Sequence, residues 1–371
     1  MTRKVLLHIG LPKTGTTFLQ EALWANKATL AERGVLLPGR DRRRHLLASL
    51  DLREDPKLAR RPGNVAHPWR DLVKEVLAWD GPTAVISHEF FAAASPAQVA
   101  RAVESFPDQE LHVIVTARDL VGLGLSRWQE WVKNGGRAGI DAYPATDDYD
   151  PTDEWGWGSF DLADILDRWG SVVPHDRIHV LPVVTGARAG DLWERFLEVV
   201  GLEHDGLPAP EEARNRSLGL VEVELLRRVN ARLKGFTSAG DRGHWIRGYL
   251  GQGHVIPRSK EKFRPAAATM QKLEERSARS VEMLRAGGYD VRGDLDSLIG
   301  RPLSPELRHP DEVSDAELLD AATRTIAGML HDVRSLTQER DRLRRELESG
   351  PLGLPARVSV SGFWSRLRKA K

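Results

Sequence analysis

The stretch VLLHIGLPKTGTTFLQEAL, residues 5–23, decides the fold of this chain. Residues 5–9 form a short apolar run, which is typical of a central parallel strand that is buried on both faces. Gly10 ends the run, and apolar residues then recur at helical spacing over residues 18–23. The predicted local structure is therefore a strand, a tight turn and a helix. Glycine within such a turn permits backbone angles that a side chain would block.

The turn between strand and helix carries the residues of an anion site. The first N–H groups of a helix are unpaired and carry partial positive charge, so they attract anions. Lys13 adds a full charge on a mobile stem, and Thr16 and Thr17 add hydroxyl donors. We therefore predict a cradle for a phosphate-like group, made by Lys13, Thr14, Gly15, Thr16 and Thr17. A Walker P-loop requires its lysine directly after the second glycine. Here the lysine precedes Gly15 by two residues, so the ATP and GTP motif is not met.

The stretch LHVIVTARDLVGLGLSRWQEW, residues 111–131, is a second strand followed by a turn and a helical pattern. Residues 111–115 resemble another buried strand, and Arg118 stands at its end. Ser126 follows eight residues later, about two helical turns, so both side chains can face the same way. The arginine side chain is a planar, permanently charged fork that suits a phosphate.

A third strand, residues 84–86, is followed by two side chains that can accept a proton, His88 and Glu89. Neighbouring side chains on a strand point to opposite faces, so we expect only one of the two to reach a substrate, unless the strand has already ended before them. The sequence leaves both open. His45 is an outside candidate for the same role.

Together these motifs resemble the sulfotransferases that use 3′-phosphoadenosine 5′-phosphosulfate (PAPS), and in particular a bacterial, actinobacterial-type branch. Further similar stretches extend the resemblance over about the first 300 residues: 128–134, 165–183, 192–202 and 215–230. The resemblance implies a P-loop-like, three-layer α/β sandwich with a central parallel sheet. It also implies that the first loop binds the 5′-phosphosulfate and that Arg118 and Ser126 bind the 3′-phosphate.

Other roles follow only from the resemblance. A histidine or a glutamate at the end of the third strand acts as base in the family. A basic segment near the end of the domain closes over the 3′-phosphate, which makes Arg258 and Lys260 candidates within residues 241–264. Arg216 and Ser217 are weaker candidates for nucleotide contact. The lysine and the helix end supply positive charge, so no metal is expected.

The implied reaction is an in-line transfer of a sulfuryl group from PAPS to a hydroxyl or amine. A carbohydrate, a glycolipid or a small molecule is the expected acceptor, and adenosine 3′,5′-bisphosphate is the product. One alternative is a P-loop kinase or NTPase, which needs Mg²⁺ and a different lysine position. Another is a non-catalytic nucleotide-binding scaffold that recruits partners through its C-terminal helix.

Strands and helices alternate along the chain, which favours a parallel sheet flanked by helices. A fourth strand is predicted at residues 178–181 and a helix at residues 191–200. Ligands of such sheets bind beyond the carboxyl ends of the strands, where all three motifs fall. Residues 141–167 contain acids and aromatic residues but no lysine or arginine. We interpret that segment either as a mobile loop whose rings stack on the acceptor or as a solvated acidic loop.

The amino-acid composition narrows the classes of function that we expect for this chain. The chain has 371 residues, a net charge of +1 and no cysteine. It therefore offers no general reason to bind nucleic acid, and no thiol chemistry. No apolar segment approaches the ~18 residues of a membrane span, and the short apolar run near the start does not suit a signal peptide. A cytoplasmic protein is expected.

The last 70 residues have a different pattern. We predict a sulfotransferase domain over residues 1–300, a proline-containing linker over 301–311, a heptad-patterned helix over 312–349 and a basic tail over 350–371. The tail could touch an anionic membrane surface, although disorder is the simpler expectation. The helix is expected to form a homodimeric coiled coil. Its seam residues alternate three and four apart: Leu319, Ala322, Ile326, Met329, Val333, Leu336, Arg340, Leu343 and Leu347.

Overall fold

A six-stranded parallel sheet forms the centre of the molecule, with strand order β2-β3-β1-β4-β5-β6. The computed structural model describes residues 2–349 apart from residues 62–65, 185, 187, 189 and 211–216. The strands are β1 (Lys4–His8), β2 (Val35–Leu36), β3 (Thr83–Ser87), β4 (Glu110–Ala117), β5 (Ile178–Pro182) and β6 (Asp290–Val291).

Helices cover both faces of the sheet. One face carries α1 (Thr16–Ala25), α2 (Lys27–Glu32) and α8 (Asp191–Val200). The opposite face carries α3 (Arg42–Leu52), α4 (Pro68–Leu77), α5 (Pro96–Glu104), α6 (Leu120–Lys133), α7 (Leu162–Gly170) and α11 (Ala267–Ala286). The remaining helices lie beyond the sheet: α9 (Leu220–Arg232), α10 (Ala239–Asp241), the π-helix η6 (Arg242–Gln252) and α12 (Asp315–Ser349). The three-layer α/β architecture is therefore confirmed, and so is the long C-terminal helix.

The central position of β1 explains its sequence. Val5 and Leu7 enter the core on the side of α3 to α7, while Leu6 enters the core on the side of α1 and α8. All three side chains are fully buried. A strand covered on both faces is expected to be apolar along its middle, as residues 5–7 are. Its neighbours are β3 and β4, and His8 lies opposite Ser87 on one side and Ile114 on the other.

The four strands predicted from apolar runs are all present, with ends shifted by one or two residues. The helix predicted for residues 191–200 is α8, and it ends at Gly201, which has a positive φ of 89°. The two edge strands β2 and β6 were not predicted. Each has only two residues, too short to leave a periodic pattern in the sequence.

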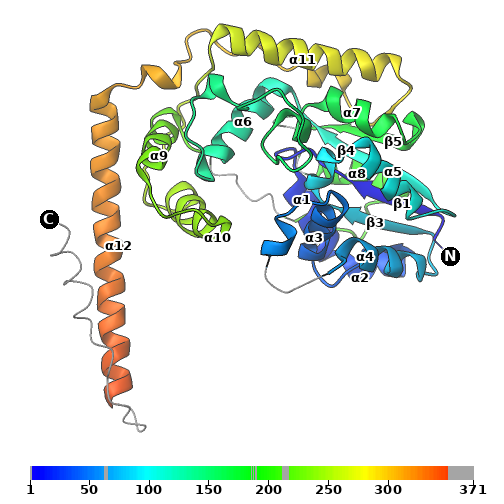
Figure 1. The fold of residues 1–371 in the computed structure, drawn as a ribbon, viewed down its shortest axis with the longest axis horizontal. Helices are drawn as coiled ribbons and strands as arrows, with labels where there is room; N and C mark the ends of the chain where they lie inside the picture. The colour runs from blue at the N-terminus through cyan, green and yellow to red at the C-terminus, as the bar shows by residue number, and fades with distance from the viewer. Residues whose placement is uncertain are drawn as a thin grey trace.

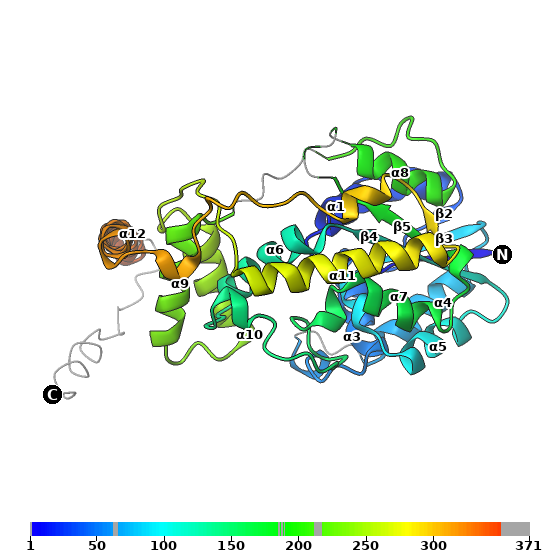
Figure 2. The same ribbon diagram turned by 90° about the horizontal axis from the view of Figure 1, so that it is seen from above.

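The C-terminal part of the described chain runs along the body before it turns into α12. Figures 1 and 2 show α11 lying across the molecule from the sheet toward α9, and α12 standing beside α9 at the far end. The predicted linker is pinned at Arg308, which forms ion pairs with Glu261 and with Glu317 of α12. The predicted tail over residues 350–371 lies outside the described residues. Among the helices that are described, none is long and apolar enough to cross a membrane.

Candidate functional site

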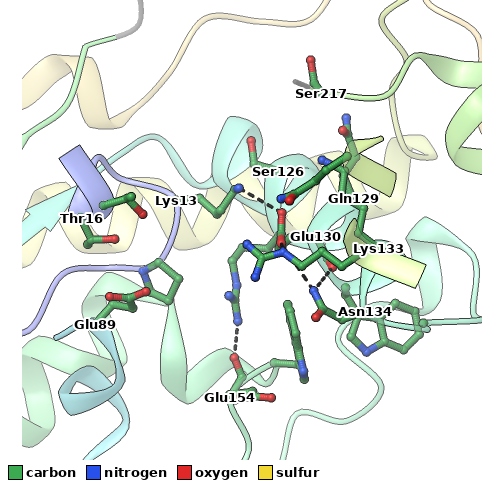
Figure 3. A pocket seen from close by; sticks show the side chains of 18 of the residues that line it. Lys13, Thr16, Glu89, Ser126, Gln129, Glu130, Lys133, Asn134, Glu154 and Ser217 are labelled. Carbon is green, nitrogen blue, oxygen red and sulfur yellow. Dashed lines mark hydrogen bonds and ion pairs between the residues drawn. The ribbon is translucent and has the colours of Figure 1, made fainter. Parts of the chain in front are cut away.

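A cavity of about 1920 Å³ opens at the carboxyl ends of the central strands (Figure 3). Its wall includes residues that follow β1, β3, β4 and β5, so four strand ends contribute to one space. The chain passes from β3 on one side of β1 to β4 on the other, which makes β1 a topological switch point. Ligands of open parallel sheets bind at such a point. The predicted convergence of the three motifs is therefore what the fold produces.

The loop after β1 has an unusual backbone. Gly10, Lys13 and Gly15 have φ angles of 72°, 69° and 83°. Positive φ is uncommon for a residue with a side chain, and it persists where surrounding contacts enforce it. At Gly10 a Cβ would lie 2.7 Å from the Thr16 methyl group and 2.8 Å from Cβ of Glu89. Glycine therefore allows the loop and the end of β3 to approach closely.

Thr14 holds this loop in shape. Its hydroxyl is buried, accepts a bond from the Leu11 N–H at 3.1 Å, and lies 2.6 Å from the Thr116 hydroxyl of β4. The Leu11 N–H also donates to the Thr116 carbonyl at 2.7 Å. The Thr14 side chain is therefore engaged within the protein, and any contact with a bound anion is left to its backbone N–H.

The helix α1 begins directly after the loop and presents its N-terminus to the cavity. Gly15 occupies the N-cap position in the left-handed conformation and provides no side-chain cap. Gly15, Thr16 and Thr17 all line the cavity wall. Uncapped N–H groups, the helix dipole and two hydroxyls therefore lie together, which is the arrangement that binds phosphate at helix ends.

Lys13 points across the cavity to α6 (Figure 3), where it forms an ion pair with Glu130 at 3.1 Å. Arg247 of η6 contacts the other carboxylate oxygen of Glu130 at 2.8 Å. Burial by itself would raise the pKa of Glu130, but Lys13, Arg247 and Lys133 hold it below its ordinary value. Burial lowers the pKa of Lys133 to about 8; Glu130 opposes this decrease, and the neighbouring cations Lys13, Arg258 and Arg247 add to it.

The result is a cluster of three cations, Lys13, Lys133 and Arg247, around one carboxylate. All four side chains line the cavity. A cluster with excess positive charge in a partly buried site attracts anions more strongly than the same charges on an open surface.

The second predicted anion site is also on the cavity wall. Arg118 follows β4, and its Nη1 atom lies 3.5 Å from the Ser126 hydroxyl on α6. Asp119 caps α6 by accepting from the Gly122 N–H at 2.6 Å and also contacts Arg118 at 3.3 Å. A Cβ at Gly122 would lie 2.5 Å from an Arg118 nitrogen, so this glycine leaves room for the guanidinium. The structure therefore brings Arg118 and Ser126 together as the eight-residue spacing predicts.

The two candidate bases occupy different environments. Glu89 lines the cavity and accepts a hydrogen bond from Gln20 of α1 at 3.0 Å. Burial would raise the pKa of Glu89, but nearby His88 and the Gln20 bond keep it below its ordinary value. His88 is buried away from the cavity wall, and its Nδ1 accepts from the Phe90 N–H at 3.1 Å. Of the two, only Glu89 is positioned to meet a ligand.

His45 is placed in the interior rather than at the site. It is fully buried on α3, where its Nδ1 accepts from the Ser87 N–H at 3.1 Å and its Nε2 lies 2.8 Å from the Pro38 carbonyl. Burial lowers the pKa of His45 to about 4. These contacts tie α3 to the end of β3 and leave no path to the cavity.

The basic segment over residues 241–264 reaches the cavity through different residues from those predicted. Arg242 and Arg247, at the start and middle of η6, line the wall. Arg258 is exposed and donates to the carbonyls of Gly251 and Gly253 at 3.2 and 2.8 Å, beyond the wall. Lys260 is exposed and is likewise outside the wall. A role for these two in nucleotide binding stays a prediction. Ser217 does line the cavity (Figure 3), whereas Arg216 lies outside the described residues.

Most aromatic residues of the acidic segment over residues 141–167 are anchors. Tyr143, Trp157 and Phe160 are buried in the main core. Trp155 is the ring from this segment that lines the cavity, and Arg127 stacks on it at 4.7 Å. Four further rings line the wall: Phe18, Phe90, Trp131 and Phe236. Aromatic side chains from five separate segments therefore face the cavity, and stacking on an acceptor stays a prediction.

Glu130 is the main site residue that the sequence did not reveal. It lies in the stretch WQEW, and its spacing from Ser126 places both on one face of α6. This four-residue spacing is the sequence feature that could have identified Glu130 as a site residue. Within the part of the chain that the structure describes, no group of three or more histidine or acidic side chains is arranged to hold a metal ion.

Comparison with known proteins gives one structural likeness. No protein-family model and no curated protein sequence matches the chain. Among solved structures, the chain is similar to a sulfotransferase from Alicyclobacillus acidocaldarius, with 15% sequence identity and a TM-score of 0.40. The aligned region covers 68% of this chain and 99% of that protein.

Proposed function

We propose that this protein is a sulfotransferase that moves a sulfuryl group from PAPS to a hydroxyl on a carbohydrate-like or glycolipid acceptor. The proposal rests on one observation. Two positively charged sites that suit anions, one after β1 and one after the adjacent strand β4, open into a single cavity, and the Glu89 carboxylate after β3 lies on the same wall. PAPS carries phosphate groups at both its 5′ and 3′ positions, so it matches two separate anion sites.

Each anion site has a distinct task in this proposal. The N–H groups of α1, with Thr16 and Thr17, hold the 5′-phosphate, and Arg118 with Ser126 holds the 3′-phosphate. Arg118 thereby distinguishes PAPS from nucleotides that lack a 3′-phosphate. Lys13 exchanges Glu130 for the leaving phosphate, whose negative charge grows as the bond between sulfur and the phosphate oxygen breaks.

Glu89 acts as the general base. It accepts the proton of the acceptor hydroxyl as the oxygen of that hydroxyl forms its new bond to sulfur. The Gln20 hydrogen bond fixes the carboxylate, and its lowered pKa keeps it ionised at neutral pH. Phe90, Trp131 and Trp155 offer flat apolar faces to the acceptor, which suits a sugar ring.

Isothermal titration tests the donor site first. Adenosine 3′,5′-bisphosphate should bind in EDTA, and adenosine 5′-monophosphate should bind about 10- to 150-fold more weakly because Arg118 loses its charged partner. ATP binding that requires Mg²⁺ would instead favour a kinase or NTPase. Equal affinity for the mono- and bisphosphate would refute the two-site model.

Turnover is the second test. Labelled PAPS is incubated with an extract, and release of the bisphosphate and transfer of label are followed. Lys13→Ala should slow transfer about 100- to 1,000-fold. Lys74→Ala, an exposed lysine on α4, is the matched control and should leave the rate unchanged. Bisphosphate binding without any transfer would favour the non-catalytic scaffold, and near-normal turnover of Lys13→Ala would contradict its role.

A further inference from the structure

The helix α12 has two apolar stripes, and within residues 2–349, as far as the structure describes them, the body covers only one of the two. The covered stripe packs near α9 and η6 and is buried at Leu318, Ala321 and Thr325. It continues to Gly328, beside Val255. It ends at Asp332, which accepts from the Tyr249 hydroxyl at 2.9 Å and lies 3.1 Å from His254 Nε2.

The second stripe is the heptad seam predicted from the sequence, and it is largely exposed. Of its members, Ala322 is partly buried against the body. The exposed apolar members, which we call the free seam, are Leu319, Ile326, Met329, Val333, Leu336, Leu343 and Leu347. Ile326 is 65% exposed and Leu347 is 74% exposed. Leu330, at the edge of the seam, is 68% exposed.

Beyond Asp332 the helix leaves the body (Figures 1 and 2). Residues 333–347 are exposed on all sides. A segment of that length extends for roughly 20 Å at 1.5 Å per residue. Isolated helices of this size are marginally stable in water, and a continuous apolar stripe on one is typical of a helix that pairs with another.

We propose that the free seam pairs with the same seam of a second copy, in a parallel two-stranded coiled coil. The charged residues beside the seam favour a second copy as the partner and a parallel orientation. In heptad notation Arg340 and Leu347 occupy a positions of the exposed segment, and the g position directly before each of them is acidic, Glu339 and Glu346. The opposite flank carries Arg344. In a parallel pair, Glu339 of each copy faces Arg344 of the other copy, so the dimer has two equivalent pairs of opposite charge.

An antiparallel pair is disfavoured by the same residues. It would set the acidic flank of one helix, with Glu339 and Glu346, against the same acidic flank of the other helix across the interface. Arg340 is the single charged residue within the seam. A lone polar residue at such a position fixes the register of a coiled coil at some cost in stability. In the parallel register it lies beside Glu339 of the second copy, which offsets its charge.

The mass of the full-length protein in solution tests the pairing. Sedimentation equilibrium at about 10 µM should give twice the chain mass of 41.4 kDa. Val333→Glu combined with Leu336→Glu places four like charges in the seam, and the dissociation constant should rise at least ~100-fold. The matched control is Ser335→Glu with Gln338→Glu, on the outer face of the same exposed segment. It should remain dimeric.

Orientation is tested by disulfide trapping, which is clean because the chain has no cysteine. Leu343→Cys should cross-link to its equivalent under mild oxidation, since equivalent seam positions meet in a parallel pair. A wild-type mass of one chain at 100 µM would overturn the proposal and leave the seam for a different protein. Cross-linking only in a mixture of Ile326→Cys and Leu343→Cys would overturn the parallel arrangement.

Discussion

Raising the pH from 7 to 9.5 should stabilise the folded protein relative to a Lys133→Met variant. Lys133 is 6% exposed on the cavity face of α6, close to Lys13 and Arg247. Its pKa is about 8 in the folded protein against an ordinary value of 10.5. The fold therefore holds this lysine in a place that disfavours its charge. Methionine has a similar length and removes only the charge.

The sign follows from proton binding. Below pH 8 the lysine is protonated in both states, so its unfavourable charge is present in full and does not change with pH. Between pH 8 and 10.5 the unfolded chain holds more protons than the folded one, so stability rises with pH. A depression from 10.5 to about 8 corresponds to about 3 kcal/mol in total at 1.36 kcal/mol per pKa unit. About 2 kcal/mol of this is gained by pH 9.5.

Urea unfolding of both proteins at pH 7, 8, 9 and 9.5, followed by tryptophan fluorescence, measures the effect. The quantity of interest is the free energy of unfolding of the wild type minus that of Lys133→Met, because other titrating groups largely cancel. That difference should grow by about 2 kcal/mol across the range. Lys74→Met, an exposed lysine on α4, is the control and should show a flat difference. If the difference in unfolding free energy between wild type and Lys133→Met changes by less than about 0.5 kcal/mol across this pH range, the Lys133 charge does not lie in a desolvated cluster of cations.

Three further predictions concern the site. Arg118→Ala should weaken adenosine 3′,5′-bisphosphate about 10- to 150-fold and leave adenosine 5′-monophosphate unchanged, as titration will show. Glu89→Gln should lower kcat about 100- to 10,000-fold with unchanged bisphosphate affinity, whereas His88→Gln should lower it less than about tenfold. The reverse order would assign the base to the histidine. Gly10→Ala should destabilise the fold by about 2–4 kcal/mol in urea, because the new Cβ meets the Thr16 methyl group and a positive φ. An unchanged unfolding midpoint would contradict that steric argument.

Local sequence patterns were sufficient for the four longer strands of the sheet and for the placement of both predicted anion-binding segments on one cavity wall. The apolar run before Gly10 marks a strand buried on both faces, and that position places the following loop at the carboxyl end of the sheet. Arg118 lies just before the N-cap of α6 and Ser126 lies on its second turn, so the short turn after β4 and the helix together bring them to 3.5 Å. In each case the information lies within one strand–turn–helix unit, so no distant contact is needed to read it.

Contacts between distant segments were not predictable in the same way. Glu130 becomes a site residue only because α6 crosses opposite the loop that carries Lys13, 117 positions earlier. In the basic segment, Arg242 and Arg247 reach the cavity because η6 is a π-helix. Its i to i+5 hydrogen bonds place residues five apart on one side, whereas a pattern search assumes the 3.6-residue period.

The choice between His88 and Glu89 was also beyond what sequence patterns could predict. Strand alternation does not decide between the two, because β3 ends at Ser87 and neither residue lies on it. The side chain that meets the cavity depends instead on how the chain leaves β3. The chain enters the short 3-10 helix η2 (Glu89–Ala93) at once, with His88 as its N-cap. Capping requires the histidine Nδ1 to turn inward to the Phe90 N–H, so the following carboxylate is turned toward the cavity.

The distribution of charge around the cavity suggests why Glu130 is present at all. A rigid loop fixes the helix end and the threonines, whereas Lys13 is a flexible side chain that would otherwise sample many positions. Glu130 holds it at the cavity wall at 3.1 Å, and Arg247 shares the same carboxylate. Glu130 is buried, and the main cost of breaking a buried ion pair is the unpaired charge left behind. In the proposed mechanism that cost is small, because Arg247 stays on the Glu130 carboxylate at 2.8 Å when Lys13 turns to a phosphate. Glu130 thus keeps Lys13 close to its point of action without competing strongly with the ligand. The excess cations, Lys133 and Arg247, remain to balance the carboxylate once Lys13 has moved.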